Sequence, residues 1–202
     1  MRSDELKKNI PEGWKSVSLS DFSSINNTSV NPESSTVYQH FSIPAYDSDK
    51  TPAIEYGSCI ESNKYKVENN SILVSKLNPK FKRVWFVGEV SSNAICSTEF
   101  MPFTTDDDLV GYLYGVLNSK HFNVFMVQGA SSSTGSRKRM DPDLCKSYKT
   151  VYPDESTISE FNKIVFPLLK EISLLRMDIH RMIQLRDYIT PLLLNGQATL
   201  SD

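Results

Sequence analysis

The spacing of apolar residues divides the chain into a β-rich part and a long helical part. Short runs of alternating or continuous apolar residues, typical of strands, occur at 17–19, 37–43, 71–76, 83–87, 94–96 and 100–103. Pro44 predicts the end of the second run, and Asn78-Pro79 predicts a turn after the third. Residues 23–36, rich in Ser, Asn, Thr and Pro, are predicted to form a loop. Apolar residues at helical spacing then predict helices over 109–117 and 120–128.

The last fifty residues follow a different period. Apolar side chains are separated by alternating steps of three and four, the a/d pattern of a coiled coil, at Ile158, Phe161, Val165, Leu168, Ile172, Leu175, Ile179 and Met182. Asp154 or Ser156 can cap the start, Asn195-Gly196 supplies a stop, and Pro167 predicts a kink or the start of the straight part. A helix over 158–194 would be about 55 Å long. Strands of a small domain span roughly 20 Å, so we expect the helix to project; the alternative is a helix packed on its own domain.

These patterns predict an α+β fold, with a β-rich domain over 10–150 and a coiled-coil-type helix over 154–197. The length of 202 residues and the 39% hydrophobic content allow one domain with an appendage. No apolar run approaches the roughly 20 residues that cross a bilayer, and we expect neither a signal peptide nor membrane association. Three scattered cysteines, Cys59, Cys96 and Cys145, indicate a reducing compartment and no structural zinc.

Charge is unevenly distributed, although the formal net charge is only −2. Residues 70–150 carry ten basic and seven acidic side chains, a net of +3, and hold two basic clusters. The first consists of Lys76, Lys80, Lys82 and Arg83, and the second of Arg137, Lys138 and Arg139. A basic triplet is often only a solvated loop. Here it follows a stretch rich in hydroxyl and backbone N–H donors: Ser131, Ser132, Ser133, Thr134, Gly135 and Ser136. Such groups bind phosphate oxygens, and Arg can bind a guanine edge, so this segment is a candidate DNA-binding loop.

The sequence gives no indication of catalysis. It contains no phosphate-binding, dinucleotide-binding, zinc-protease or nucleophile-elbow motif, and His40, His121 and His180 are isolated. Residues 78–81, Asn-Pro-Lys-Phe, partly match an adenine methyltransferase signature but lack its second proline and any cofactor motif, which favours a turn. The aspartates at 106–108 precede a helix and are interpreted as a cap rather than a metal site. We therefore predict no catalytic residue, no cofactor and no metal.

Five segments in order resemble the DNA specificity (S) subunits of type I restriction–modification systems. Residues 11–21 are similar to the P-x-G-W-x-x-x-x-L-x-D entry into a target recognition domain, and 69–75 to the G-D-I-L-I-S strand, with Asn-Ser replacing Gly-Asp. Residues 112–122 resemble the Y-L-x-x-x-L-x-S-x-x-F helix, and 129–140 the G-S-T-G loop. Residues 185–197 are close to the L-R-D-x-L-L-P-x-L-x-x-G end of the spacer helix.

The resemblance implies a non-catalytic, cytoplasmic prokaryotic subunit that recognises double-stranded DNA for methyltransferase (modification) and restriction subunits. In this interpretation residues 131–139 contact DNA, and Lys76, Lys80, Lys82 and Arg83 position phosphates. The spacer helix would form a homodimer through Phe161, Val165, Leu168, Ile172, Leu175, Ile179 and Met182. The usual subunit has two recognition domains and two spacer helices, so this chain corresponds to a half-sized subunit or a fragment. The alternative function is a coiled-coil interaction adaptor whose β-rich domain binds protein.

Overall fold

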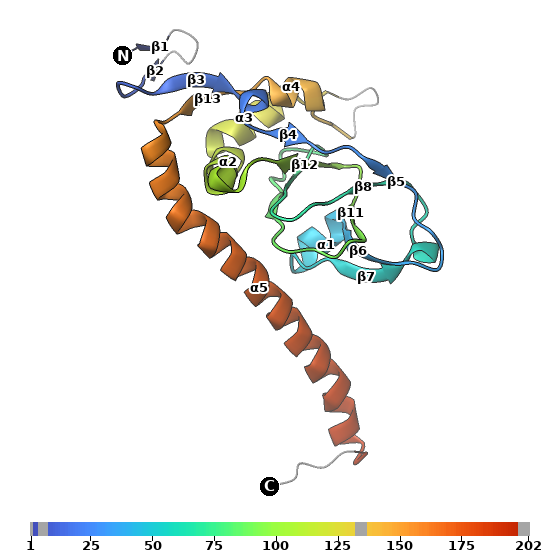
Figure 1. Ribbon diagram of the computed structural model, residues 1–202. Coiled ribbons are helices and arrows are strands. Elements are labelled where there is room, and N and C mark those ends of the chain that lie inside the picture. The colour runs from blue at the N-terminus through green and yellow to red at the C-terminus, as the bar shows by residue number, and fades with distance from the viewer. Residues whose placement is uncertain (1, 4–7, 132–136, 198–202) are drawn as a thin grey trace.

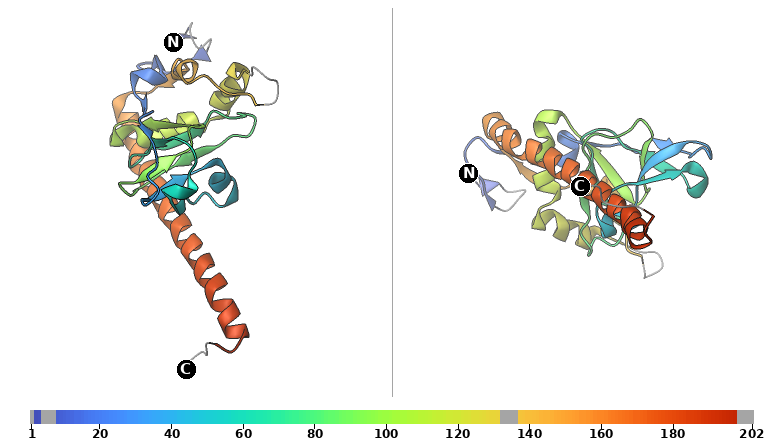
Figure 2. Two further views of the ribbon diagram at one scale, coloured as in Figure 1. Left: turned by 90° about the vertical axis from the view of Figure 1, so that its right-hand side faces the viewer. Right: turned by 90° about the horizontal axis from the view of Figure 1, so that it is seen from below.

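A β-rich body carries one long helix that extends away from it (Figure 1, Figure 2). The computed structural model describes residues 2–3, 8–131 and 137–197. Its helices are α1 (Ile43–Ser48), α2 (Val110–Leu117), α3 (Lys120–Gly129), α4 (Pro142–Lys146) and α5 (Glu155–Leu194), with short 3-10 turns at Leu19–Asp21, Gly57–Cys59 and Asp107–Leu109. Its strands are β1 (Arg2–Ser3), β2 (Lys8–Asn9), β3 (Lys15–Ser18), β4 (Ser24–Ile25), β5 (Ser29–Val30), β6 (Val37–Phe41), β7 (Ala53–Tyr56), β8 (Lys64–Lys66), β9 (Ile72–Ser75), β10 (Val84–Phe86), β11 (Ala94–Cys96), β12 (Phe100–Thr104) and β13 (Lys149–Tyr152).

The antiparallel sheet β10-β9-β12-β4 lies between two hydrophobic cores. Alternate residues of β9 point to opposite faces, so Ile72 and Val74 enter one core and Leu73 enters the other. The first core is covered by α2, α3 and the start of α5, whereas the second contains Trp85 and Phe41. Coverage on both faces explains why residues 72–74 are continuously apolar rather than alternating.

A second sheet has the order β5-β8-β11-β6-β7. Its β11–β6 pair is parallel, and the remaining pairs are antiparallel. One face shares the Trp85 core with the first sheet, and the other buries Tyr38, Ile60 and Ile95. The final strand β13 returns to pair with β3, which brings residues 149–152 against residues 15–18 and places the start of α5 beside the N-terminal region.

The predicted strands and helices are confirmed within a few residues, with two local exceptions before β7. Residues 23–36 contain the short strands β4 and β5 in addition to loop, because each pairs with a distant strand. After β6 the chain enters α1 rather than a loop. Ser42 caps this helix by accepting a hydrogen bond from Ala45 N at 3.2 Å. Pro44 lies in the first turn of α1, where the backbone N–H has no partner within the helix. A proline is therefore tolerated at the start of this helix, although it cannot continue the preceding strand.

The aspartates at 106–108 lie at the start of the helical segment, as predicted, but none of them makes the expected side-chain capping hydrogen bond. Asp106 occupies the N-cap position of the preceding 3-10 turn but makes no capping hydrogen bond. The donor in the first turn of α2 is satisfied from another element instead: Gly111 N donates to Asn162 Oδ1 of α5 at 2.7 Å. Asn162 Nδ2 in turn donates to the Asp107 carbonyl at 2.9 Å. A tertiary contact thus replaces the expected local cap.

Helix α5 begins and ends where the sequence predicts. Asp154 Oδ1 accepts from Thr157 N at 2.9 Å, and hydrogen bonds from Ser156 and Thr157 hold the pKa of the Asp154 carboxyl well below its usual range. At the other end Gly196 has a φ of +66°, and Gln197 N donates to Leu192 O, closing the helix with a left-handed glycine. The helix continues through Pro167 and Pro191.

The first part of α5 packs on the body, and the second part projects from it (Figure 1). Ile158, Asn162 and Leu169 are buried against the body. Further along, His180 Nδ1 lies 2.8 Å from Asp49 Oδ2. The expected projection is confirmed, and the alternative of a helix packed on its own domain describes only the N-terminal part of α5.

We predict that Asn162→Ala lowers the free energy of unfolding by about 1–3 kcal/mol, because the buried Gly111 N–H loses its acceptor. Urea denaturation at one fixed chain concentration measures the change. Lys163→Ala, at the exposed neighbouring position, is the control and should change stability by no more than about 0.5 kcal/mol. Equal midpoints for the wild type and both variants would contradict this role of Asn162.

Candidate nucleic-acid interface

The two basic clusters, separated by more than fifty residues in the sequence, lie side by side in the structure. Asn78 N donates to Lys138 O at 2.8 Å, and Lys138 N donates back to Asn78 Oδ1 at 3.1 Å. Met140 N donates to Lys76 O at 3.0 Å, and Leu77 forms a bridge with Arg139. The extension of β9 therefore holds the segment 138–140 along its edge, and both clusters contribute to one surface.

The segment that carries Arg137 and Lys138 is closed at its base. Ser131 N donates to Arg139 O at 3.1 Å, and Arg139 N donates to Ser131 O at 2.9 Å. Met140 is buried behind this pair, and its Sδ would lie 2.8 Å from a Cβ placed on Gly129. The absence of a side chain at Gly129 thus allows the end of α3 to pack on Met140. The other predicted contact residues, Ser132, Ser133, Thr134, Gly135 and Ser136, lie outside the described residues.

Two of the predicted DNA-contacting arginines are held by carboxylates. Arg83 makes a two-point contact with Asp47, with both N···O distances at 2.7 Å. This contact raises the pKa of Arg83 and lowers that of Asp47. Arg139 binds Glu99 in the same manner, with Nη2 at 2.6 Å from Oε1, which raises the pKa of the Arg139 guanidinium. Both guanidiniums are oriented, and part of their charge is balanced.

The remaining basic residues are better placed to attract phosphate. Lys82 Nζ donates to the carbonyl of Asn118 at 3.0 Å. Within the described part of the chain, Lys80, Arg137 and Lys138 are exposed and form no ion pair, and the partly exposed Lys76 also has no acidic partner. These uncompensated cations lie on either side of the contact between residues 78 and 138. The surface can therefore bind anions through Lys and recognise planar acceptor edges through Arg137.

A groove of about 340 Å³ separates the turn after β9 from the Arg137–Lys138 segment. Its apolar lining consists of Pro79, Phe81, Val127 and Ala130, and its polar lining consists of Asn78, Lys80 and Lys138. Phe81 is one of the most exposed aromatic side chains of the body, with 61% of its surface accessible. The groove combines an apolar floor with a cationic rim.

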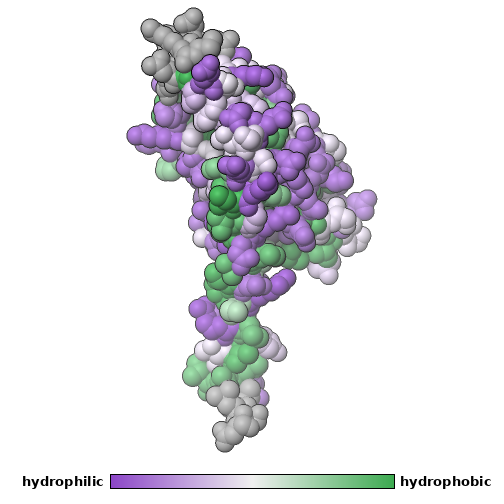
Figure 3. All heavy atoms as spheres, turned by 60° about the vertical axis from the view of Figure 1, so that its left-hand side comes forward, coloured by the Kyte–Doolittle hydropathy of each residue, from purple (hydrophilic) through white to green (hydrophobic). Residues whose placement is uncertain are grey.

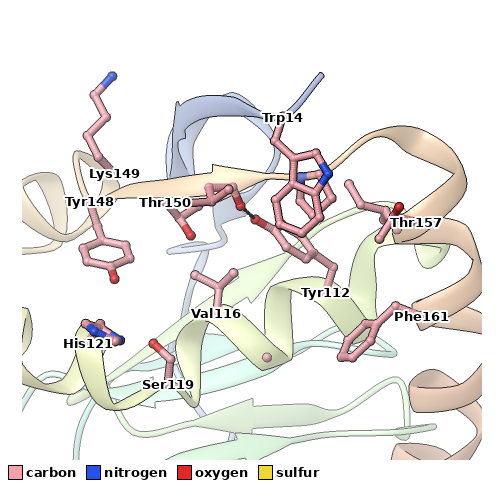
Figure 4. Close-up of a pocket in the computed structure, with 14 residues that line it drawn as sticks. Trp14, Tyr112, Val116, Ser119, His121, Tyr148, Lys149, Thr150, Thr157 and Phe161 are labelled. Carbon is pink, nitrogen blue, oxygen red and sulfur yellow. Dashed lines mark hydrogen bonds between the residues drawn. The ribbon is translucent and has the colours of Figure 1, made fainter. Parts of the chain in front are cut away.

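A larger cavity of about 630 Å³ lies between β13, α2 and the start of α5 (Figure 4). Rings dominate its lining, among them Trp14, Tyr112 and Phe161, and the Tyr112 hydroxyl donates to the carbonyl of Val151. Ser119 Oγ accepts from Phe122 N at 3.1 Å as the cap of α3. The Ser119 hydroxyl thus caps α3 at the edge of this cavity, which His121 and Tyr148 also line.

The predicted dimerisation residues form an exposed apolar stripe on α5 (Figure 3). Among the seven, Phe161, Leu168, Ile172, Leu175, Ile179 and Met182 are exposed. Val165 is different, because it points toward α2 and packs against the body's core together with Ile158. Successive helix residues differ by about 100°, so one face of α5 contacts the body and the neighbouring face carries the stripe.

No helix in the described ranges is long and apolar enough to cross a membrane. Among the same residues, no three potential metal ligands cluster together. Two of the histidines have carboxylate partners: His40 Nδ1 lies 2.5 Å from Glu55 Oε1, and His180 pairs with Asp49. Burial outweighs the effect of Glu55 and lowers the pKa of His40.

Comparison with known proteins points to one class. No family model matches the sequence. The chain is 22% identical over 211 aligned positions to the specificity subunit of the type I restriction enzyme MjaIX from Methanocaldococcus jannaschii, covering 99% of this chain and 48% of that protein. Its fold matches the HsdS subunit of Thermoanaerobacter tengcongensis with a TM-score of 0.65 and 18% identity, over 92% of this chain and 48% of the other.

Two further solved structures have a similar fold. A chain from a type I restriction–modification system matches with a TM-score of 0.64 and 19% identity, over 96% of this chain and 53% of the other. The S subunit from M. genitalium matches with a TM-score of 0.57 and 12% identity, over 92% of this chain and 47% of the other. The chain spans about half the length of each relative. The resemblance to type I specificity subunits and the predicted α+β fold are therefore confirmed: the chain has the fold of one half of such a subunit.

Sequence reasoning missed three features of this surface. It did not pair residues 76–78 with 138–140, and it did not identify Asp47 and Glu99 as the partners of Arg83 and Arg139. It also interpreted Phe81 only as part of a turn. The signal available was the Lys80-Phe81-Lys82 sequence, an aromatic residue between two lysines at a turn, where burial is least expected.

We predict that Asn78→Ala exposes the Lys138 amide, because that N–H loses its side-chain acceptor. Hydrogen exchange followed by mass spectrometry should show faster exchange in peptides that contain residues 138–140. Asn78→Asp keeps an acceptor at this position and tolerates the φ of +46°, so it should exchange like the wild type. Slow exchange in both variants would mean that the backbone bonds alone fix the segment.

Proposed function

We propose that this chain recognises a specific DNA sequence for a type I restriction–modification complex. In this proposal the β-rich body at 10–150 is the target recognition domain, and the helix at 154–197 is the spacer. Partner subunits carry out adenine methylation and restriction, and this chain contributes no catalytic residue. The supporting observation is the convergence of the two basic clusters on one surface of a fold that matches half of known specificity subunits.

The surface is suited to duplex DNA because it combines two types of group. Lys80, Lys138 and Lys76 offer mobile ammonium groups for phosphates, whose contacts set position but not sequence. Arg137 offers a planar donor pair for a guanine edge. Arg83 and Arg139 are already oriented by Asp47 and Glu99, and each can share its remaining donors with DNA. The described residues thus supply both positioning and reading groups.

The apolar stripe on α5 supports pairing with a second spacer helix. Phe161, Leu168, Ile172, Leu175, Ile179 and Met182 are apolar side chains that a single chain leaves exposed to water. Two copies related by a two-fold axis would bury both stripes and present two identical recognition surfaces. A DNA target read by such a dimer has inverted half-sites separated by a gap that the helix length sets.

The salt dependence of binding distinguishes this proposal from the alternative, an adaptor whose body binds protein. Methylation mapping in cells that carry the chain with its methyltransferase subunit defines the cognate duplex. Affinity for that duplex should fall steeply with salt, with a slope of about −0.9 in log K per phosphate contact, because counterions are released. The cognate duplex should also bind more tightly than a scrambled one at matched salt. Binding that depends little on salt or sequence would favour the adaptor.

Arg137→Ala is predicted to weaken cognate binding more than binding to the scrambled duplex, by about 1–3 kcal/mol of discrimination, if Arg137 reads a guanine. Arg139→Ala should weaken both duplexes, because it removes a cation and leaves Glu99 uncompensated beside the DNA. Arg181→Ala, the same charge change on the projecting helix, is the matched control. Unchanged affinity for both duplexes in a folded Arg137→Ala, Arg139→Ala double variant would overturn the assignment of this segment.

Leu175→Asp is predicted to dissociate the dimer, because Leu175 lies mid-stripe with 50% of its surface exposed. Burying a Leu-sized side chain is worth roughly 1.5–3 kcal/mol per copy, and a buried carboxylate adds a further cost. Sedimentation at tens of micromolar measures the outcome. Leu174→Asp is the matched control: this residue is 59% exposed but is rotated about 100° away from the stripe. A monomeric wild type at this concentration would contradict the proposed pairing.

A further inference from the structure

Phe81 stands out on the basic surface because its ring is exposed although the neighbouring apolar residues are buried. Val84, Trp85 and Phe86 of the following strand are in the cores, whereas 61% of Phe81 is accessible. Its sequence neighbours are Lys80 and Lys82. Val127, from α3, is also 41% exposed and lines the same groove. Lys80 and Lys138 line the groove beside these two apolar side chains.

The backbone turn that carries Phe81 is held by the surrounding structure. Phe81 N donates to Asn78 O at 2.9 Å, which closes the turn, and Asn78 is in turn bonded to Lys138. The Arg83 guanidinium lies 5.8 Å from the centre of the Phe81 ring, and Asp47 holds that guanidinium on its other side. A turn held in this way needs little reorganisation on binding, which favours its use in recognition.

We propose that Phe81 is a specificity-determining residue that contacts the 5-methyl group of a thymine in the major groove. This inference rests on the proposed function of DNA recognition. Charge complementarity selects the partner: the cationic rim made by Lys80 and Lys138 attracts phosphates and repels a positively charged surface. The apolar floor of Phe81 and Val127 requires an apolar group at the same place. In the major groove the thymine methyl is the apolar group that a base pair presents.

The geometry supports a contact at a base edge rather than a deeper site. The groove beside Phe81 has a volume of about 340 Å³ and is lined on one side by the turn and on the other by Ala130 and Lys138. A surface turn can enter a major groove about 12 Å wide, and Lys80 and Lys138, which line the same groove of the protein as Phe81, then lie close to phosphates. Phe81 would therefore recognise thymine over cytosine, which lacks the methyl group, while the lysines bind all sequences alike.

The experiment uses the full chain with its methyltransferase subunit and the cognate duplex defined by methylation mapping. Each thymine of the half-site is replaced, one at a time, by uracil, which removes only the methyl group. For the wild type, one such replacement should weaken binding about fourfold, the loss expected for one buried methyl group. In Phe81→Ala the same replacement should have no further effect, and Phe81→Leu should keep part of the discrimination. The salt dependence should stay unchanged, since no charge is removed.

Tyr56→Ala is the matched control, because Tyr56 is 58% exposed on the edge strand β7 and should leave thymine discrimination intact. Three results would overturn the inference while leaving DNA recognition standing. The first is a wild type that binds every uracil duplex as tightly as the cognate duplex. The second is a Phe81→Ala variant that still discriminates thymine from uracil. The third is a Phe81→Ala variant that binds DNA normally but no longer assembles with the methyltransferase subunit. A wild type that does not prefer the cognate over a scrambled duplex would instead overturn the proposed function itself.

Discussion

The docking of α5 on α2 through Asn162 is the contact on which the rest of the structure depends. The buried Asn162 amide accepts from Gly111 N and donates to the Asp107 carbonyl, so it caps the start of α2 and fixes α5 against it at the same point. A side chain at Gly111 would place its Cβ 2.9 Å from Asn162 Oδ1, so the absence of one permits the close approach. This contact sets the direction in which α5 leaves the body, and with it the direction of the apolar stripe.

The basic surface depends on a different constraint, the burial of β9 on both faces. Because Ile72 and Leu73 enter separate cores, a one-residue slip of β9 would exchange the side chains packed in the two cores and disrupt the packing of both. The end of the strand is therefore fixed, and so is the turn that carries Lys80 and Phe81. The segment 138–140 then pairs with this fixed edge, and the buried Met140 anchors it. Two surface segments thus acquire a defined geometry from the packing beneath them.

Helix α5 serves two environments along its length. Its N-terminal part is buried on the body, and its C-terminal part has apolar residues on more than one side, including Leu185 and Tyr188. A helix that is apolar around much of its circumference is stable in water only when other elements cover it. The projecting part is thus suited to an assembly with more than one contact surface, in agreement with the half-subunit fold.

The sequence alone determined the elements whose signals are local. The alternating three- and four-residue spacing of apolar side chains located α5, and Asp154 and Gly196 marked its ends. The order of the motifs indicated a type I specificity subunit.

Tertiary structure decided what depends on contacts between distant segments. The sequence assigned a cap to the aspartates at 106–108, but an amide 51 residues beyond Gly111 supplies it. It proposed two basic clusters without pairing them, because the alignment of residues 76–78 with 138–140 follows from sheet register. It assigned Val165 to the outer stripe, because heptad spacing does not indicate which face of a helix its own domain covers.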